Sequence, residues 1–391
     1  MRVLIDYRPA LRARSGVGEY THELARALLA EYAPGGPRRQ LELTLFSSSW
    51  KDRFAESSEL AGAVRIDRRV PVAVLNLAWH RLEWPAIEAL SGASFDVAHS
   101  SHPLLVPARA AAQVITIHDL NFLTNPERTA AEIRRDYAAL VGDHARRADA
   151  VIVSSAFAAG EVEQRLGVAR ERIAICPPGA PEWVPRAAAP ANGYVLFFGT
   201  LEPRKNIGGL LDAYQRLFEG RGAKASAERR ETAEAIPELI LAGRATDAAR
   251  PWLERIARPP LAGRVRHIGY VDPSQRRELY AGARLLVQPS FEEGFGLTVL
   301  EAMSLGVPVV AARRGSLPEV TDDAALLVDP ESSEDLARGI ERMLRDARYA
   351  AECAAKGLAR ARTFRWSATA RLVYGTYERA VARRAQRAGA A

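Results

Sequence analysis

Two glutamates eight residues apart, Glu293 and Glu301, lie in the segment PSFEEGFGLTVLEAMSLG, residues 289–306. The short apolar run Ala283–Gln288 before it predicts a strand, and Leu297–Leu305 predicts a helix that a glycine and a proline terminate. Glu293 would then lie on the connecting loop and Glu301 about one turn into the helix. Both carboxylates could point to the space above the carboxyl end of the strand, where they would accept hydrogen bonds from sugar hydroxyls.

The same loop predicts an anion site. The backbone amides of Gly294, Phe295, Gly296 and Leu297 would lie at the N-terminus of the predicted helix. Such an end carries unpaired N–H groups and the positive end of the helix dipole. The segment is therefore suited to a ligand that is both phosphorylated and polyhydroxylated.

Two cations, Arg204 and Lys205, directly follow the apolar run YVLFFG. This places them at the carboxyl end of a strand, the edge at which open parallel sheets bind ligands. We expect them to meet a diphosphate from the edge of a cleft, with no role for Lys205 in the core. The alternative is a solvated pair at a helix start, with Asn206 as the N-cap. The sequence contains no Asp-x-Asp pair to bridge a metal ion, so we predict fixed cations and no metal requirement.

Further candidates lie in the first half of the chain. Gly16 and Gly18, in the run SGVG before a predicted helix from residue 19, would let the backbone approach a phosphate or sugar closely. His118 and Asp119 follow the strand VITI. The histidine could bind a transferred sugar and Asp119 could orient an acceptor or the imidazole; the alternative is local capping of a turn.

Two other histidines, His99 and His102, lie three residues apart after another predicted strand. This spacing suggests a metal site, but no third ligand is apparent in the sequence. We expect both side chains to line a cleft.

The motifs taken together resemble those of the retaining glycosyltransferases of sequence family four. The frame EGFGLTVLEAM is preceded by FFGTLEPRKN at 197–206 and ILAGR at 240–244. The likeness extends from SGVGEYTHELARALL at 15–29, through VIVSSAFAAGEV at 151–162, to FRWSATARLVYGTYERA at 364–380. The resemblance implies the α/β GT-B fold, with two Rossmann-like, doubly wound parallel-sheet domains facing across a cleft. The donor would lie mostly on the second domain, with the glycine loop facing its diphosphate.

The resemblance also implies roles. Glu293 would contact the donor sugar or stabilise its cationic transition state, and Glu301 would bind the nucleotide ribose. Several relatives carry an arginine where this chain has Thr200, so Arg204 and Lys205 would bear more of the phosphate contact.

The frames GTLEPRKN and HDLNF are most similar to those of bacterial mannosyltransferases. We therefore expect transfer of a hexose, mannose from GDP-mannose, to a glycan or lipid-linked acceptor in polysaccharide biosynthesis. The alternatives are a UDP-sugar-dependent transferase, an epimerase or phosphorylase of the same fold, and a non-catalytic sugar-nucleotide-binding protein.

The elements that would position these residues form two series of apolar strands separated by helical patterns, which indicates parallel sheets covered on both faces. The predicted strands are Val3–Asp6, Leu41–Phe46, Asp96–His99, Val114–Ile117, Ala150–Val153 and Arg172–Cys176, then Tyr194–Phe198, Glu238–Leu241, Val265–Ile268, Leu285–Gln288, Val307–Ala311 and Ala325–Val328. The proline-rich stretch 176–193 is the predicted linker, which gives an acceptor-side domain 1–185 and a nucleotide-sugar domain 186–365.

The last segment, 366–391, is a predicted helix with an apolar stripe of Trp366, Ala370, Val373 and Tyr377. The resemblance implies that this helix crosses back to the first domain. The alternative is a helix docked wholly on the second.

Composition narrows the class of protein. The chain has 391 residues, enough for two domains, and a net charge of +7 from 50 Arg and only 4 Lys against 47 acidic residues. No nucleic-acid-binding motif accompanies this charge, so we expect no nucleic-acid partner. Peripheral contact with an anionic membrane stays open, through arginines such as Arg134, Arg135, Arg146 and Arg147 or through the segment Trp79–Trp84.

The two cysteines, Cys176 and Cys353, suggest neither a disulfide framework nor a metal site. The chain begins directly in a predicted strand and has no run of eighteen apolar residues, so we expect a cytoplasmic protein without a signal peptide or a membrane span. Residues 219–237 predict a charged surface insertion.

Overall fold

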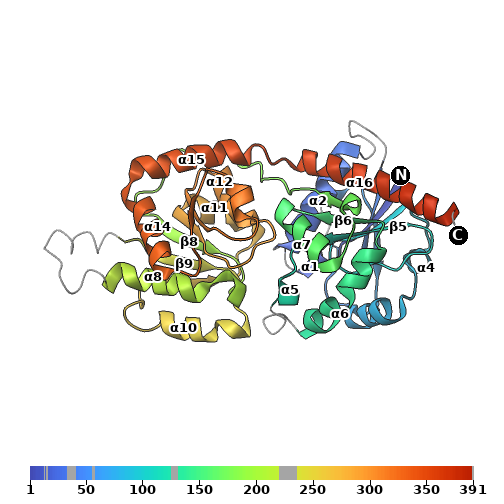
Figure 1. The fold of residues 1–391 in the computed structure, drawn as a ribbon, viewed down its shortest axis with the longest axis horizontal. Coiled ribbons are helices and arrows are strands. Elements are labelled where there is room, and N and C mark those ends of the chain that lie inside the picture. Colours follow the sequence, from blue (N-terminus) through green and yellow to red (C-terminus); the bar gives the residue numbers. More distant parts are fainter. Residues whose placement is uncertain are drawn as a thin grey trace. The chain divides into compact units, whose positions relative to one another are not determined.

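The computed structural model describes residues 1–12, 14, 16–32, 41–54, 58–124, 131–219 and 236–389. The chain forms two compact units, one of residues 1–179 with 364–391 and one of residues 180–363 (Figure 1). These bounds differ by a few residues from the expected division near 185 and 365. Most of the expected insertion at 219–237, and Ser15 of the glycine loop, lie outside the described residues.

The first unit is built on a seven-stranded parallel sheet of order β3-β2-β1-β4-β5-β6-β7. Its chain order reverses between the neighbours β1 and β4, as in a doubly wound sheet. The strands are β1 (Arg2–Asp6), β2 (Glu42–Ser48), β3 (Val64–Arg68), β4 (Val97–Ser100), β5 (Ala112–Ile117), β6 (Ala150–Val153) and β7 (Ile173–Ile175).

Sequence analysis missed β3, because VRIDR alternates charged and apolar residues. The strand lies at the edge of the sheet and its side chains are half-buried or exposed, so it lacks the continuous apolar run of the inner strands.

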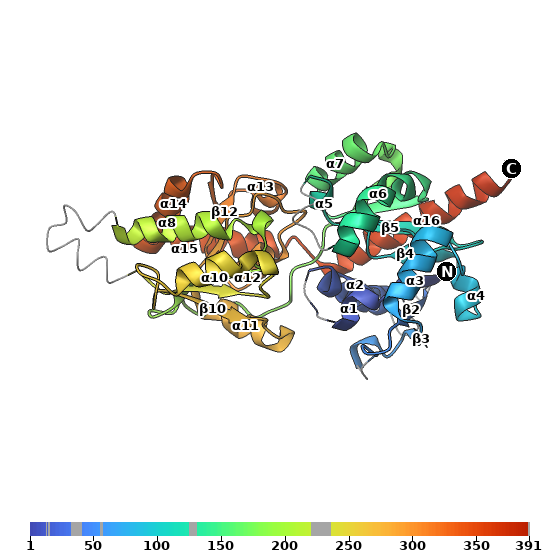
Figure 2. The same ribbon diagram turned by 90° about the horizontal axis from the view of Figure 1, so that it is seen from below.

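Helices lie on both faces of this sheet (Figures 1 and 2). They are α1 (Arg8–Arg12), α2 (Val17–Tyr32), α3 (Val72–Leu77), α4 (Ile87–Ser91), α5 (Asn121–Thr124), α6 (Ala131–Arg147), α7 (Ala156–Leu166) and α16 (Trp366–Gly389), with the short helices η1 (Ser58–Leu60), η2 (Ala78–Leu82, a π-helix) and η4 (Arg170–Arg172).

The C-terminal helix α16 belongs to the core of the first unit. The predicted stripe of Trp366, Ala370, Val373 and Tyr377 is buried among side chains of α2, β1 and β5. On the same helix, the ring of Tyr374 stacks on that of Tyr32 with centroids 4.1 Å apart. The last segment of the chain thus completes a hydrophobic core that begins with its first strand.

His99 lies in this core and does not line a cleft, so the expectation for it was wrong. Its ring is fully buried, with Nδ1 2.7 Å from the hydroxyl of Tyr377 and Nε2 2.8 Å from that of Thr116. Burial lowers the pKa of His99 to about 3, so the imidazole is neutral. The histidine therefore ties α16 to the sheet.

The second unit is built on a six-stranded parallel sheet of order β10-β9-β8-β11-β12-β13. The strands are β8 (Tyr194–Phe198), β9 (Leu239–Ala242), β10 (Val265–Gly269), β11 (Ala283–Gln288), β12 (Val309–Ala312) and β13 (Leu326–Val328). All six were predicted from their apolar runs, to within two residues at each end. The chain order reverses between β8 and β11, which places the ligand-binding edge of this sheet at their carboxyl ends.

The helices of the second unit also cover both faces of its sheet (Figure 1). They are α8 (Ile207–Glu219), α10 (Arg250–Ile256), α11 (Pro273–Ala281), α12 (Leu297–Ser304), α13 (Leu317–Thr321), α14 (Ser333–Arg345) and α15 (Ala347–Ala361), with the short helices η5 (Pro203–Lys205) and η6 (Asp247–Ala249). The expectation of two doubly wound parallel sheets is confirmed.

Cys176 and Cys353 are both buried and free, as expected. Among the described residues, no helix is both long enough and apolar enough to cross a membrane.

Candidate active site

The carboxyl ends of β8 and β11 bring Lys205 and Glu293 together. Lys205 ends the short helix η5 after β8, and Glu293 lies on the loop after β11. The Lys205 ammonium is 2.5 Å from Oε1 of Glu293, and both residues are more than nine-tenths buried. The expectation that Lys205 has no role in the core was wrong, because its charge is buried in an ion pair.

Glu293 accepts two further hydrogen bonds on the same oxygen. The amide of Gln288 donates at 2.7 Å and the hydroxyl of Ser290 at 2.9 Å. Burial alone would raise the pKa of Glu293, but the charges of Lys205 and Arg204 outweigh it and lower the pKa to about 2. The carboxylate is therefore ionised at neutral pH.

Arg204 lies on the other side of this carboxylate. Its guanidinium is 3.8 Å from Oε2 of Glu293 and 2.7 Å from the carboxylate of Glu202, and it donates to the carbonyl of Glu292. Arg204 and Lys205 thus form no solvated pair, contrary to the alternative considered for them. Arg204 therefore contacts both the carboxylate of Glu293 and the backbone of the loop that carries it.

Hydrogen bonds of the Asn206 side chain hold the loop after β8 against the loop after β11. Asn206 donates through its amide to the carbonyls of Pro289 and Pro330, at 3.1 and 2.7 Å, and its Oδ1 accepts from the amide of Gly209. Asn206 is therefore the N-cap of α8 and also an anchor for the neighbouring loop. Because these bonds fix η5 next to the β11 loop, Lys205 is held against Glu293.

The backbone of Glu293 is fixed from a third element, the loop before α13. Ser316 donates to the Glu293 carbonyl through both its amide, at 3.1 Å, and its hydroxyl, at 2.9 Å. A Cβ at Gly315 would lie 2.7 Å from the same carbonyl oxygen, so only glycine allows this approach.

The N-terminus of α12 lies where the sequence predicted it. Gly296 is its N-cap, with φ of 100°, and no side chain caps this end of the helix. A helix start of this kind is the feature on which the predicted anion site rests. Gly294 and Phe295 are buried in that loop.

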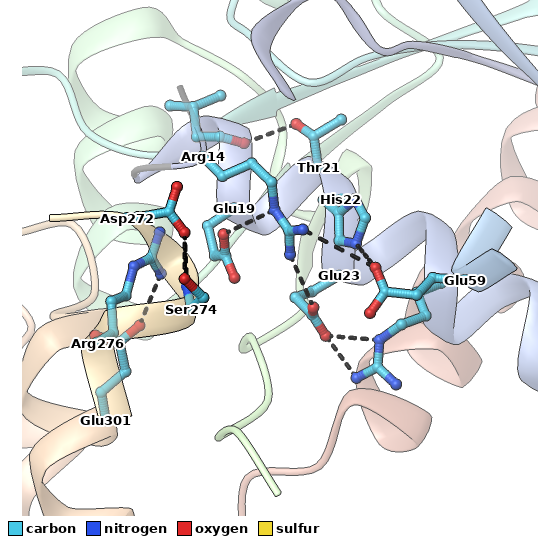
Figure 3. Close-up of polar contacts among 12 residues, drawn as sticks. Arg14, Glu19, Thr21, His22, Glu23, Glu59, Asp272, Ser274, Arg276 and Glu301 are labelled. Carbon is cyan, nitrogen blue, oxygen red and sulfur yellow. Dashed lines mark hydrogen bonds and ion pairs between the residues drawn. The ribbon is translucent and has the colours of Figure 1, made fainter. Parts of the chain in front are cut away.

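Glu301 lies in the second turn of α12, paired with groups from α11. Oε1 is 3.3 Å from the guanidinium of Arg276, and Oε2 accepts a 2.6 Å hydrogen bond from the hydroxyl of Tyr280. All three residues are more than nine-tenths buried. Figure 3 shows Arg276 directed at Glu301. Each of the two predicted glutamates therefore has its own cation.

In the first unit, the glycine loop leads into α2, which begins at Val17 rather than at residue 19. Gly16 has φ of 52°, and Gly18 is buried in the first turn of the helix. Arg14 holds the loop, with its guanidinium 3.3 Å from Glu19 and 3.7 Å from Glu23 (Figure 3). A φ of this sign favours glycine at position 16.

His118 follows β5 and packs edge-on against Tyr20 of α2, with ring centroids 4.8 Å apart. Burial lowers its pKa to about 4, so the ring is neutral. Nε2 lies 3.2 Å from the carbonyl of Ser101 and must donate to it, which makes Nδ1 an acceptor. Asp119 accepts a hydrogen bond from the backbone amide of Asn121 at 3.2 Å. This contact caps a turn, which is the alternative to ligand binding considered above.

His102 is directed at β1. Its Nε2 is 3.2 Å from the carboxylate of Asp6, which is fully buried and also pairs with Arg8 at 2.6 Å. Among the described residues, no three His, Cys, Asp or Glu side chains are grouped so that they could hold a metal ion.

The residues that position Glu293 and Glu301 were not predicted from the sequence. Gln288 and Ser290 had a usable signal, because they are polar residues at the end of an otherwise apolar strand. Arg276 and Tyr280 had none, since a charged residue on a surface helix does not indicate that it is buried.

Comparison with known proteins agrees with this architecture. Residues 192–346 match the family model described as glycosyl transferases group 1, and residues 14–182 match that of glycosyltransferase family 4. The chain is 30% identical to O-antigen chain mannosyltransferase B of Escherichia coli over 388 residues, which covers 94% of this chain and 96% of that protein.

Solved structures show the same fold. Sucrose-phosphate synthase from Thermosynechococcus elongatus superposes with a TM-score of 0.73 at 21% identity, covering 96% of this chain and 98% of that one. HepE of Anabaena, in complex with UDP-glucose, superposes with a TM-score of 0.65 at 19% identity, covering 96% and 99%. Together with the two parallel sheets, these matches show that the chain is a GT-B glycosyltransferase and belongs to glycosyltransferase family 4.

Proposed function

We propose that this enzyme transfers mannose from GDP-mannose, with retention of anomeric configuration, to a glycan or lipid-linked acceptor in polysaccharide biosynthesis. Two observations support the proposal. One is the similarity to the Escherichia coli O-antigen mannosyltransferase over nearly the whole of both chains. The other is the ionised Glu293 held against Lys205 at the carboxyl edge of β8 and β11.

The chemistry follows from the charges at this edge. As the bond to the anomeric carbon breaks, negative charge develops on the leaving diphosphate and positive charge on the sugar. The negative charge on the diphosphate can be stabilised by Lys205, Arg204 and the amides of residues 294–297. The positive charge on the sugar can be stabilised by the carboxylate of Glu293. Because Lys205 contacts Glu293 directly, one ion pair would serve both charges. We therefore propose that transfer needs no metal ion.

Glu301 is the proposed ligand of the nucleotide ribose. Arg276 and Tyr280 fix its carboxylate, so a hydroxyl pair would meet an acceptor that is already oriented. On the first unit, Gly16 and Gly18 are proposed contacts for a phosphate or sugar. Nδ1 of His118 is an available acceptor for a sugar hydroxyl, and Asp119 fixes the turn that follows it.

The experiment that tests donor choice is a thermal-shift panel of GDP, UDP and ADP with the full chain. A ligand at a hundred times its dissociation constant stabilises the folded state by about 2.7 kcal/mol. We expect GDP to raise the melting temperature most. A shift with UDP alone would overturn GDP-mannose as the donor and favour a UDP-sugar-dependent transferase. Donor consumption without transfer to an acceptor would favour an epimerase.

A further inference from the structure

A pocket of about 590 Å³ lies on the first unit, away from the candidate donor residues. Gln113, which lines it, is at the start of β5, and Asp149 immediately precedes β6. The pocket is thus at the amino-terminal edge of the sheet, whereas His118 lies at the carboxyl edge. Both views place α4 and the last turns of α16 at this end of the unit (Figures 1 and 2).

The pocket is rich in arginine. Arginines from three parts of the chain line it: Arg109, Arg146, Arg147, Arg384 and Arg387. Three carboxylates offset part of this charge, with Arg147 bound to Glu83 and Asp143 and with Arg387 bound to Asp149. Within the described residues, the guanidinium of Arg109 has no hydrogen bond or ion pair. A guanidinium carries five N–H donors, so Arg109 can offer a phosphate a bidentate contact while the neighbouring arginines add positive charge.

An exposed apolar face adjoins these arginines. The helices α3 and η2 bury Leu75 and Trp79 but present Leu77 and Leu82 to solvent, at 59% and 70% exposure. Trp84, 65% exposed, follows η2 and lines the arginine pocket. The outer face of a surface helix is normally polar, so this pattern is unusual. In the segment Trp79–Trp84, the buried Trp79 cannot contact a membrane, whereas the exposed Trp84 can.

We propose that the arginine pocket and this apolar face form a docking surface for an anionic phospholipid membrane. The pocket would take lipid headgroup phosphates, while Leu82 and Trp84 would enter the headgroup region, where indole rings are favoured. Arginines attract anionic lipid headgroups and tryptophan rings favour the membrane interface, so the two kinds of side chain lying together fit an anionic membrane surface. The docking is independent of the proposed function, since it needs neither donor nor acceptor.

The test is co-sedimentation of the full chain with vesicles of phosphatidylcholine alone and of phosphatidylcholine mixed with phosphatidylglycerol. Arg109→Gln with Arg384→Gln removes two charges but leaves Asp149 paired with Arg387. The matched control is Arg371→Gln with Arg338→Gln, two arginines outside the pocket whose side chains are 44% and 61% exposed. Each basic residue near an anionic surface contributes about 1 kcal/mol, so the pocket pair should weaken vesicle binding roughly thirtyfold.

A second pair of variants tests the apolar face. Leu82→Ser with Trp84→Ser should reduce binding to the mixed vesicles, whereas Leu372→Ser, at a 47% exposed position of α16, should not. Unchanged melting temperatures would show that the variants are folded. No binding by the wild type, equal binding to both vesicle types, or equal losses in the control variants would overturn the proposal. Binding of inorganic pyrophosphate at this pocket without vesicle binding would make it a soluble-anion site and would also overturn it.

Discussion

Replacing Glu293 by glutamine removes the negative charge of the buried pair and leaves the Lys205 ammonium without its counter-charge. The two side chains are only 9% and 11% exposed, and Arg204 adds a second positive charge 3.8 Å from Oε2. Removing one partner of a buried pair costs about 3–5 kcal/mol. At about 2–4 °C for each kcal/mol in a domain of this size, the second unit should melt roughly 6–20 °C lower.

Differential scanning calorimetry of the full chain measures this shift. The matched control is Glu254→Gln, which breaks an exposed pair with Arg250 in the same unit and should cost less than about 0.5 kcal/mol. Adding Lys205→Met to Glu293→Gln removes both charges and should recover most of the loss. If Glu293→Gln melts like the control, or if the two substitutions are simply additive, the pair is not coupled as the structure indicates.

The pH dependence gives an independent check of the same pair. The pKa of Glu293 is lowered to about 2 from its usual 4.5, so its stabilisation is complete above the higher value and is lost as the pH falls through the lower one. This amounts to about 3 kcal/mol. The difference in melting temperature between wild type and Glu293→Gln should therefore shrink between about pH 5 and pH 2; a constant difference would contradict the assigned ionisation.

Four further predictions concern catalysis, nucleotide binding, the positioning of Glu301 and the C-terminal helix. Lys205→Ala should lower turnover roughly 10²-fold or more, and wild-type transfer should persist in EDTA; a change of only a few-fold, or loss of activity that magnesium restores, would contradict the proposed role. Glu301→Ala should weaken GDP binding by about 1.5–3 kcal/mol in isothermal titration. Arg276→Leu should raise the donor KM with little change in kcat, with partial rescue by Arg276→Lys; an unchanged KM would show that Arg276 does not position Glu301. Deleting everything after Arg365 should expose the core of the first unit and lower its solubility, and a fully soluble, active product would contradict the packing of α16.

The sequence was sufficient to predict the parallel sheets, because buried inner strands are continuous apolar runs. It also correctly placed Glu293, Glu301 and Lys205 on loops and helices at the carboxyl edge of the second sheet. It did not predict that Lys205 is buried, because burial depends on a partner 88 residues away. For the same reason it misjudged His99, whose partner Tyr377 is 278 residues away.

Local geometry was easier to predict than pairing. A glycine at a helix start and a polar residue at the end of a strand can be recognised from the residues next to them in the sequence. Arg276 differs, since a helix that carries several charges does not reveal which of them points inward. Only the packing of α11 against α12 assigns it to Glu301.

The most direct test of the central claim is transfer from GDP-mannose to a short mannoside, with the product analysed by mass spectrometry and the anomeric signal read by NMR. Wild-type enzyme should release GDP and form an α-linked mannosyl product in the presence of EDTA, whereas Glu293→Gln should form far less under the same conditions. Formation of a β-linked product, or equal product from Glu293→Gln, would contradict a retaining transfer centred on Glu293 and Lys205.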